Sequence, residues 1–166
     1  SPRMLDLLEE FRALVGALEA EAVEFAVCGG LAVAVHSHPR ATLDIDLLLP
    51  TSQVDRARAV ATRLGYAIDA GRLVVRDRVV ELFQLSKPDP ETGDLLGLDL
   101  LAVTPPLADV WAGRERVAWA HGTLPVVSRA GLVAMKRLRG SGQDLDDIRV
   151  LESGEGGGGE PGGETA

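Results

Sequence analysis

The chain has 166 residues, of which 46% are hydrophobic and 25% charged, a composition typical of a folded globular domain rather than a disordered or collagen-like chain. Its 17 Lys and Arg residues against 25 Asp and Glu residues give a net charge of −8 at pH 7. This charge argues against a protein that binds nucleic acid mainly through its overall charge, although it does not exclude a local basic groove.

Helical and strand-like patterns alternate through the first half of the chain. Apolar residues at helical spacing predict an amphipathic helix over residues 3–21. Gly29-Gly30 breaks the first apolar strand pattern, and Pro50 ends the second. Ser52 with Asp55 resembles a capping box for a helix that Gly65 ends. The other elements predicted here are a strand at 24–28, a helix at 31–36, a strand at 42–49, and strands near 66–69 and 72–76.

The second half continues the alternation. His121-Gly122 is a hairpin signal between two short strand patterns, and Ser128 is a candidate cap for a helix that runs to Arg139. Interleaved helices and strands predict an α/β or α+β class with a central sheet. The predicted elements are strands at 78–86 and 96–103, a loop at 87–93, a short helix at 105–112, strands at 117–120 and 124–127, and a last helix marked by Leu145, Ile148 and Leu151.

One domain is expected over residues 1–151, followed by a tail at 152–166. The tail holds 7 of the 19 glycines and carries glutamates but no Lys or Arg. Because such a segment cannot bury apolar surface, we expect a flexible acidic appendage.

Several classes of protein are disfavoured by what the sequence contains. A single cysteine, Cys28, rules out an internal disulfide, and with three histidines it cannot complete a structural zinc site of the four-cysteine or two-cysteine, two-histidine type. No apolar run approaches the ~18 residues of a membrane span, and the first ten residues lack the apolar core of a signal peptide. We therefore expect a cytoplasmic protein without a membrane partner.

Three aspartates fall on strand patterns that are otherwise apolar. Asp44 and Asp46 are two residues apart and so share one face of a strand, while Ile45 and Leu47 face the core. Two carboxylates within about 7 Å repel each other, and Mg²⁺ or Mn²⁺ is the natural partner for an all-oxygen site. Asp99 lies on a later apolar strand. If that strand is next to 42–49, three carboxylates converge, a donor set that can clamp two metals for displacement at phosphorus.

Gly29 and Gly30 supply a second feature of phosphate chemistry. A turn from a strand through two glycines into a helix presents backbone N–H groups at a helix N-terminus, which suits a phosphate. Glycine also lets the backbone approach a ligand closely. Each part alone has a plain structural explanation, but the order of strand, glycine pair, helix, Asp-x-Asp strand and later Asp strand is far more specific.

This order resembles the signature of the nucleotidyltransferase (polymerase-beta-like) superfamily: an apolar residue, Gly, Gly or Ser, a spacer, Asp, an apolar residue, and Asp or Glu. The run from Gly29 to Leu49 looks most similar to the AbiEii-type branch, the nucleotidyltransferase toxins of type IV toxin–antitoxin systems, and to related minimal enzymes. Two late segments also match that branch, Leu132–Lys136 and Gln143–Ile148, so the resemblance covers about 24–151.

The resemblance implies a nucleotidyltransferase-like mixed central sheet flanked by helices, with further helices at the C-terminal end. It implies a Mg²⁺- or Mn²⁺-dependent transfer of a nucleoside monophosphate from a nucleoside triphosphate to a hydroxyl, with tRNA as a candidate acceptor and a cognate antitoxin as a candidate partner. The residues that it places in the site are Asp44, Asp46 and Asp99 as catalytic and metal-binding groups, and Gly29, Gly30, Arg40, Thr42, Lys136 and Asp144 as nucleotide-binding groups.

Some of these residues have simple structural alternatives. Lys136 is one of only two lysines among fifteen arginines, and without the resemblance it would be assigned to a solvated helix position. Arg40 could pair with Asp44 instead of a phosphate. Asp144 lies near a predicted helix start, where the helix dipole favours an acid in any case.

Two other functions are compatible with the same residues. One is a catalytically silent nucleotidyltransferase-like module that binds a nucleotide or a partner protein, although such a module has no chemical need for all three carboxylates. The other is an enzyme that modifies a small molecule such as an aminoglycoside. An acidic acceptor cleft would favour a cationic small molecule, and a basic cleft would favour tRNA.

Overall fold

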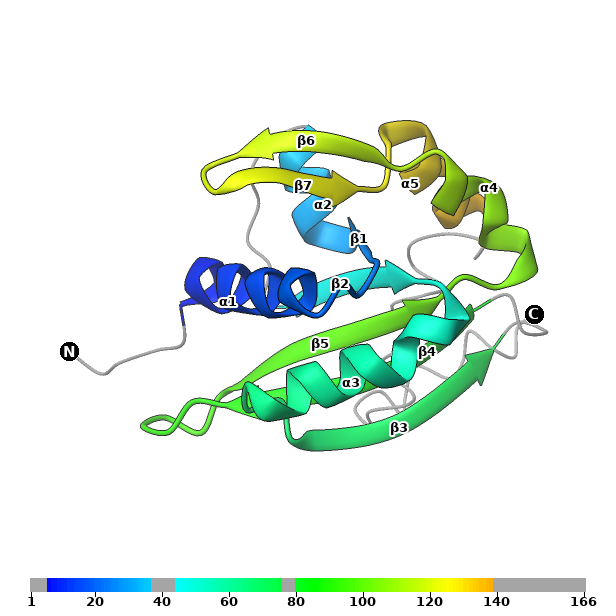
Figure 1. The fold of residues 1–166 in the computed structure, drawn as a ribbon. Coiled ribbons are helices and arrows are strands. Elements are labelled where there is room, and N and C mark those ends of the chain that lie inside the picture. The colour runs from blue at the N-terminus through cyan, green and yellow to red at the C-terminus, as the bar shows by residue number, and fades with distance from the viewer. Residues whose placement is uncertain (1–5, 37–43, 76–79, 139–166) are drawn as a thin grey trace.

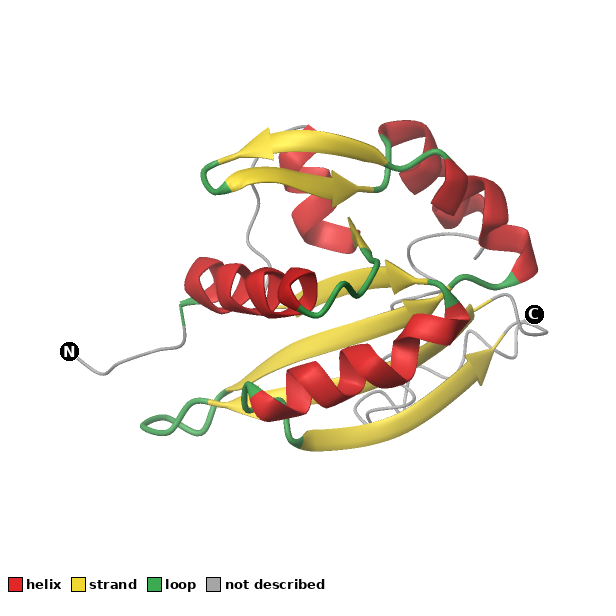
Figure 2. Ribbon diagram, in the orientation of Figure 1, coloured by secondary structure: helices red, strands yellow, loops and turns green. Residues whose placement is uncertain are grey.

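A mixed sheet forms the centre of the computed structural model, which describes residues 6–36, 44–75 and 80–138. The described residues form a seven-stranded sheet with the order β3-β4-β5-β2-β1-β7-β6, and helices pack around it (Figures 1 and 2). This arrangement confirms the predicted α/β class with a central sheet. No helix in the described ranges is long and apolar enough to cross a membrane.

Strands and helices are interspersed along the chain, with β3 to β5 and β6 to β7 following one another directly. The strands are β1 Ala26–Cys28, β2 Asp44–Leu49, β3 Ile68–Val75, β4 Val80–Pro88, β5 Leu95–Ala102, β6 Glu115–Trp119 and β7 Gly122–Val126. The helices are α1 Leu7–Ala20, α2 Gly29–His36, α3 Val54–Arg63, α4 Ala108–Ala112 and α5 Arg129–Leu138, with 3₁₀ turns η1 at Thr51–Gln53 and η2 at Pro105–Leu107.

Both parallel and antiparallel pairings occur in the sheet. β2 pairs in parallel with β5, and β1 pairs in parallel with β7. The β1–β2, β3–β4, β4–β5 and β6–β7 pairs are antiparallel. Because β2 and β5 lie side by side, the condition under which Asp99 would approach Asp44 and Asp46 is met.

Two helices cover one face of the sheet. Alternate residues of β2 and β5 point to this face, among them Leu47 and Leu98, and pack against Leu14 of α1 and Val60 of α3 in one buried apolar cluster. Figure 1 shows α1 and α3 lying across the strands on the same side. We call this surface the α1/α3 face; in the two central strands it is defined by Ile45, Leu47, Leu49, Leu98 and Leu100.

The opposite face divides into an apolar end and a polar end. Leu48 and Leu101, which are register partners, belong to a second apolar cluster with Val110 of α4 and Met135 of α5. Toward the N-terminal ends of the same two strands, leucine gives way to aspartate. We call this surface the carboxylate face; in the two central strands it is defined by Asp44, Asp46, Leu48, Gly97, Asp99 and Leu101.

The boundaries of several elements differ from their predictions. α1 begins at Leu7 because the Asp6 side chain caps it, accepting hydrogen bonds from the backbone N–H groups of Leu8 and Glu9 at 3.0 and 3.3 Å. α2 begins at Gly29 itself, so the glycine pair forms the first turn of the helix rather than a break before it.

Further outcomes concern turns, caps and strand boundaries. The predicted Ser52 capping box is wrong: Ser52 lies in the 3₁₀ turn η1, and Gln53, at the N-cap position of α3, makes no side-chain cap bond. The two strands predicted near 66–69 and 72–76 are one strand, β3, with an irregularity between Asp69 and Gly71. The 117–127 hairpin is confirmed, and so is the Ser128 cap, whose Oγ accepts from the Gly131 N–H at 3.0 Å. The last predicted helix and the tail at 152–166 lie outside the described residues.

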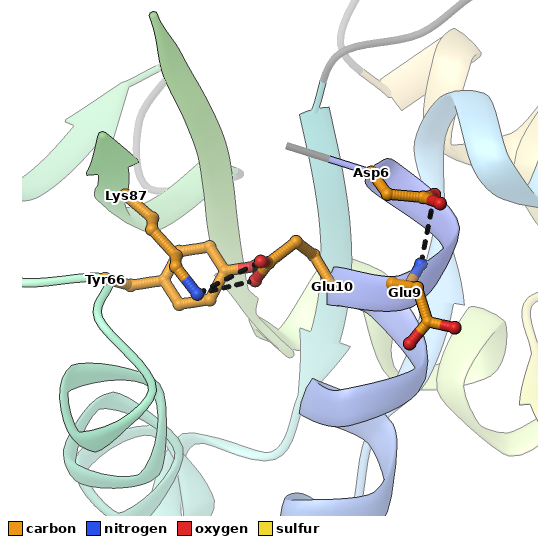
Figure 3. Close-up of polar contacts among 5 residues, drawn as sticks. All are labelled: Asp6, Glu9, Glu10, Tyr66 and Lys87. Carbon is orange, nitrogen blue, oxygen red and sulfur yellow. Dashed lines mark hydrogen bonds and ion pairs between the residues drawn. The ribbon is translucent and has the colours of Figure 1, made fainter. Parts of the chain in front are cut away.

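A polar cluster links α1 to β4 on the α1/α3 face (Figure 3). Glu10 of α1 accepts hydrogen bonds from Lys87 Nζ at 2.9 and 3.0 Å and from the Tyr66 hydroxyl at 3.2 Å. Tyr66 is almost fully buried, at 1% exposure. Burial raises the pKa of the Tyr66 phenol above its ordinary value, and the charge of Glu10 and the hydrogen bond to it raise this pKa further.

Tyr66 should therefore resist ionisation in the folded chain. An unfolded tyrosine ionises near pH ~10, so the contribution of Tyr66 to stability is complete below that pH and is lost as the pH rises above it. The chain has one tyrosine, so tyrosinate absorbance reports on Tyr66 alone. We expect a higher apparent pKa in the native chain than in urea, and an intermediate value in Glu10→Gln. Equal ionisation in native and urea-unfolded protein, with the fold checked by circular dichroism, would contradict this.

Candidate active site

The turn from β1 into α2 brings Gly29 against the side chain of Asp46. Gly29 has a φ of +65°, in the left-handed region, and a Cβ built on it would lie 2.0 Å from Asp46 Oδ2. Both the backbone conformation and the lack of space therefore require glycine at this position. Since α2 starts here, the Asp46 carboxylate lies at a helix N-terminus, where the helix dipole favours negative charge.

Asp46 and Asp99 are neighbours across the parallel pair of central strands. They are register partners in the β2–β5 ladder, so their side chains leave the same face of the sheet at adjacent positions. Both are buried, with exposures of 6% for Asp46 and 5% for Asp99. Each makes at least one further polar or electrostatic interaction. Two acids this close, and this little exposed, are costly unless positive groups compensate them.

Asp44 lies on the same face of the sheet, two residues before Asp46 in β2. Its register partner is Gly97 of β5. A Cβ on Gly97 would lie 2.6 Å from Asp44 Oδ1, so the carboxylate occupies the space that a side chain at this position would fill. Asp44 is partly exposed, whereas the rest of β2 is buried. The predicted placement of Asp44 and Asp46 on one face, opposite Ile45 and Leu47, is confirmed.

The three carboxylates share a face but lean in different directions. Asp44 extends toward Gly97 of β5, while Asp46 extends toward Gly29 of α2. Among the residues that the structure describes, no three Asp, Glu, His or Cys side chains are gathered closely enough to hold one metal ion. The donor set itself consists of carboxylate oxygens, which are the ligands that Mg²⁺ and Mn²⁺ prefer.

The other predicted site residues divide into those the structure places and those it does not. Gly30 lies in the first turn of α2, and Lys136 lies exposed in the last turn of α5, which contacts α2. Arg40, Thr42 and Asp144 lie outside the described residues.

Sequence reasoning missed two residues of this face. Gly97 makes room for Asp44, and Gln84 of β4 is the register partner of Asp99. A glycine two residues before Asp99 in an apolar strand is a signal of close approach that could have been recognised. Gln84 carried no comparable signal, because its proximity to Asp99 depends on the β4–β5 register.

Comparison with known proteins gives a structural likeness without a sequence match. No protein-family model matches the chain, and no curated protein matches it by sequence. A crystal structure from Thermotoga maritima, of a protein provisionally assigned as a nucleotidyltransferase, superposes with a TM-score of 0.61 at 13% identity, covering 89% of this chain and 93% of that one. The chain has a nucleotidyltransferase-like fold.

Two structures of ANT(2'')-Ia are less similar. The crystal structure in complex with adenylyl-2''-tobramycin has a TM-score of 0.48 at 12% identity, covering 90% of this chain and 96% of that one. The solution structure of this antibiotic-resistance factor has a TM-score of 0.47 at 13% identity, covering 89% and 90%. These lower scores do not establish a shared fold.

The contact between Gly29 and Asp46 makes a direct prediction about stability. Gly29→Ala forces a Cβ into the Asp46 carboxylate and a side chain into the left-handed region, so it should destabilise the chain by at least about 1–2 kcal/mol. Gly16→Ala is the matched control, because Gly16 lies within α1 with nothing within 4 Å of a Cβ. It should stabilise the helix by up to about 1 kcal/mol. Urea unfolding measures both, and a Gly29→Ala chain as stable as wild type would refute the tight contact.

Proposed function

We propose that this protein is a metal-dependent nucleotidyltransferase that transfers a nucleoside monophosphate from a nucleoside triphosphate to a hydroxyl group. The observation that supports this most is the register of β2 with β5, which sets Asp46 beside Asp99 on the face where α2 begins at Gly29. The fold likeness to the Thermotoga maritima protein agrees with it.

The proposed reaction assigns each carboxylate a role. Asp44, Asp46 and Asp99 would hold Mg²⁺ or Mn²⁺, which neutralises charge that develops on the phosphate oxygens. The acceptor oxygen attacks the α-phosphorus, and the bond from that phosphorus to the bridging oxygen breaks, so pyrophosphate leaves with the electron pair. Asp99 takes the proton of the attacking hydroxyl.

The proposed nucleotide contacts lie on the α2 side of the carboxylates. The first N–H groups of α2, at Gly29 and Gly30, would hold the β- and γ-phosphates. Lys136 would reach the triphosphate from α5, which packs against α2. From the sequence resemblance, Arg40, Thr42 and Asp144 would complete this part of the site.

The cellular role is a further proposal that rests on the resemblance to AbiEii-type toxins alone. It would make the protein a toxin with a cognate antitoxin, and tRNA is then the candidate acceptor against which the small-molecule acceptor argued below is tested. The silent binding module is the competing function. Two buried carboxylates at adjacent register positions favour the enzyme, because a divalent cation needs such oxygen ligands and a binding module has no chemical need for them.

Thermal unfolding with each of the four nucleoside triphosphates, with and without Mg²⁺, tests the proposal. At a triphosphate concentration about 100 times Kd, binding adds about 2.7 kcal/mol to the free energy of unfolding. For a domain of this size that raises the midpoint by roughly 5–10 °C. We expect this shift with Mg²⁺ and at least one triphosphate, and its loss in Asp44→Asn.

Asp94→Asn is the control, because Asp94 is exposed and its hydrogen bonds use only its backbone groups. It should keep the full Mg²⁺-dependent shift. The absence of any shift in wild type at millimolar triphosphate, with folded protein, would reject the proposed enzyme and favour the silent module.

A further inference from the structure

The carboxylate face extends past Asp99 onto β4. In the antiparallel β4–β5 ladder, Gln84 is the register partner of Asp99, and Ser86 is the partner of Gly97. Register partners point to the same side of a sheet. A row of side chains therefore crosses three strands, from Asp46 through Asp99 to Gln84, at right angles to the chain direction.

Gln84 is a polar residue with unused hydrogen-bonding capacity. Its side chain is partly buried, and its amide makes no hydrogen bond to any residue in the described part of the chain. The Ser86 hydroxyl is likewise partly buried and makes none. Gln84 and Ser86 are neighbours across the row of Asp99 and Gly97, and neither side chain is engaged by another residue of the described ranges, so both are available to a ligand. An amide can both donate to and accept from a hydroxyl.

Strand β3, which pairs with β4, leaves space beside Gln84. The register partner of Gln84 is Gly71, which has a φ of +89° and nothing within 4 Å of a Cβ placed on it. The irregularity before Gly71 is fixed by Asp69, whose Oδ1 accepts from the Gly71 N–H at 2.8 Å. Arg58 of α3 in turn binds Asp69 at 2.5 Å. The opening is therefore a fixed feature of the strand, supported from the α1/α3 face.

Charge on β3 and β4 is segregated between the two faces. The charged side chains Arg72, Glu81 and Lys87 are all on the α1/α3 face, by their register with Phe83, Val74 and Leu96. On the carboxylate face, the described residues of β3, β4 and β5 include no Lys or Arg. Tight binding of a nucleic acid depends on Lys and Arg contacts to phosphates, so this surface is poorly suited to a polyanion.

Resting on the proposed function, we infer that the β3–β4–β5 part of the carboxylate face binds the acceptor, and that the acceptor is a small molecule with several hydroxyls and no negative charge. Gln84 binds the reacting hydroxyl and holds its oxygen beside Asp99, which takes the proton as that oxygen bonds to the α-phosphorus and pyrophosphate leaves. The triphosphate lies on the opposite side of the carboxylates, toward α2 and α5. The donor and acceptor thus approach the carboxylates from opposite sides.

Label transfer from α-³²P-labelled triphosphate with Mg²⁺ tests the inference on two probes, total tRNA and a pool of polyols, sugars and amino sugars. We expect labelled small products and unlabelled tRNA. Gln84→Met keeps the length of the side chain but removes the amide that would bind the acceptor, so it should lower transfer at least tenfold, mainly through a higher acceptor KM. Its thermal shift with Mg²⁺ and triphosphate should equal that of wild type.

Arg72→Met is the matched control, since Arg72 is on β3 beside Gly71 but on the other face, in a half-exposed ion pair with Glu81. Arg72→Met should transfer label as wild type does. Gln84→Asn, which keeps an amide, should transfer label faster than Gln84→Met. Three outcomes would overturn the inference: label in tRNA, no label in the small-molecule pool despite a triphosphate shift, or unchanged transfer by Gln84→Met. The absence of a thermal shift with triphosphate in wild type would instead reject the proposed function. Failure of the inference and failure of the proposed function are therefore distinguishable.

Discussion

The parallel pairing of β2 with β5 is the constraint on which the candidate site depends. It sets Asp46 against Asp99 with both side chains nearly inaccessible to water. A strand pair that buries two acids at adjacent positions loses stability at that point unless positive groups compensate them. Apolar burial in the rest of each strand offsets this loss. All residues of β2 after Asp44 are buried, and apolar clusters form on both faces of the sheet. The packing of the neighbouring apolar residues therefore holds the two acids in place.

The two faces of the sheet differ in the side chains that they present. The α1/α3 face holds the larger apolar cluster together with the ion pairs, including Lys87 with Glu10 and Arg72 with Glu81. The carboxylate face keeps its apolar packing at one end and leaves polar groups at the other. Because side chains alternate along a strand, β4 serves both: Lys87 fastens α1 on one side, while Ser86 and Gln84 point to the other.

Local sequence patterns predicted most helices and strands, but they predicted contacts between strands only if a particular strand order was assumed. The alternation around Ile45 is enough to place Asp44 and Asp46 on one face, and the pair Gly29-Gly30 indicates a close approach without naming its partner. That Asp99 is beside Asp46 depends on strand order, which no local pattern contains. Ser52 fails as a cap because a 3₁₀ turn precedes α3 there, and Gln53 turns its side chain to the Glu24 N–H at 3.3 Å.

Glycine explains how acids fit inside so closely packed a sheet. A methyl group at Gly29 would overlap the Asp46 carboxylate, and one at Gly97 would overlap that of Asp44. Each glycine therefore makes the room that one aspartate occupies, at the cost of backbone entropy that glycine brings to a strand or helix. Two acids in the otherwise apolar strand β2, with glycines facing them from α2 and β5, are a local conflict with stability, and conflicts of this kind are expected at functional sites. Gly71 differs from these two glycines, because it leaves open space beside Gln84, whose side chain bonds to no residue in the described ranges; this is why we extend the site to β4.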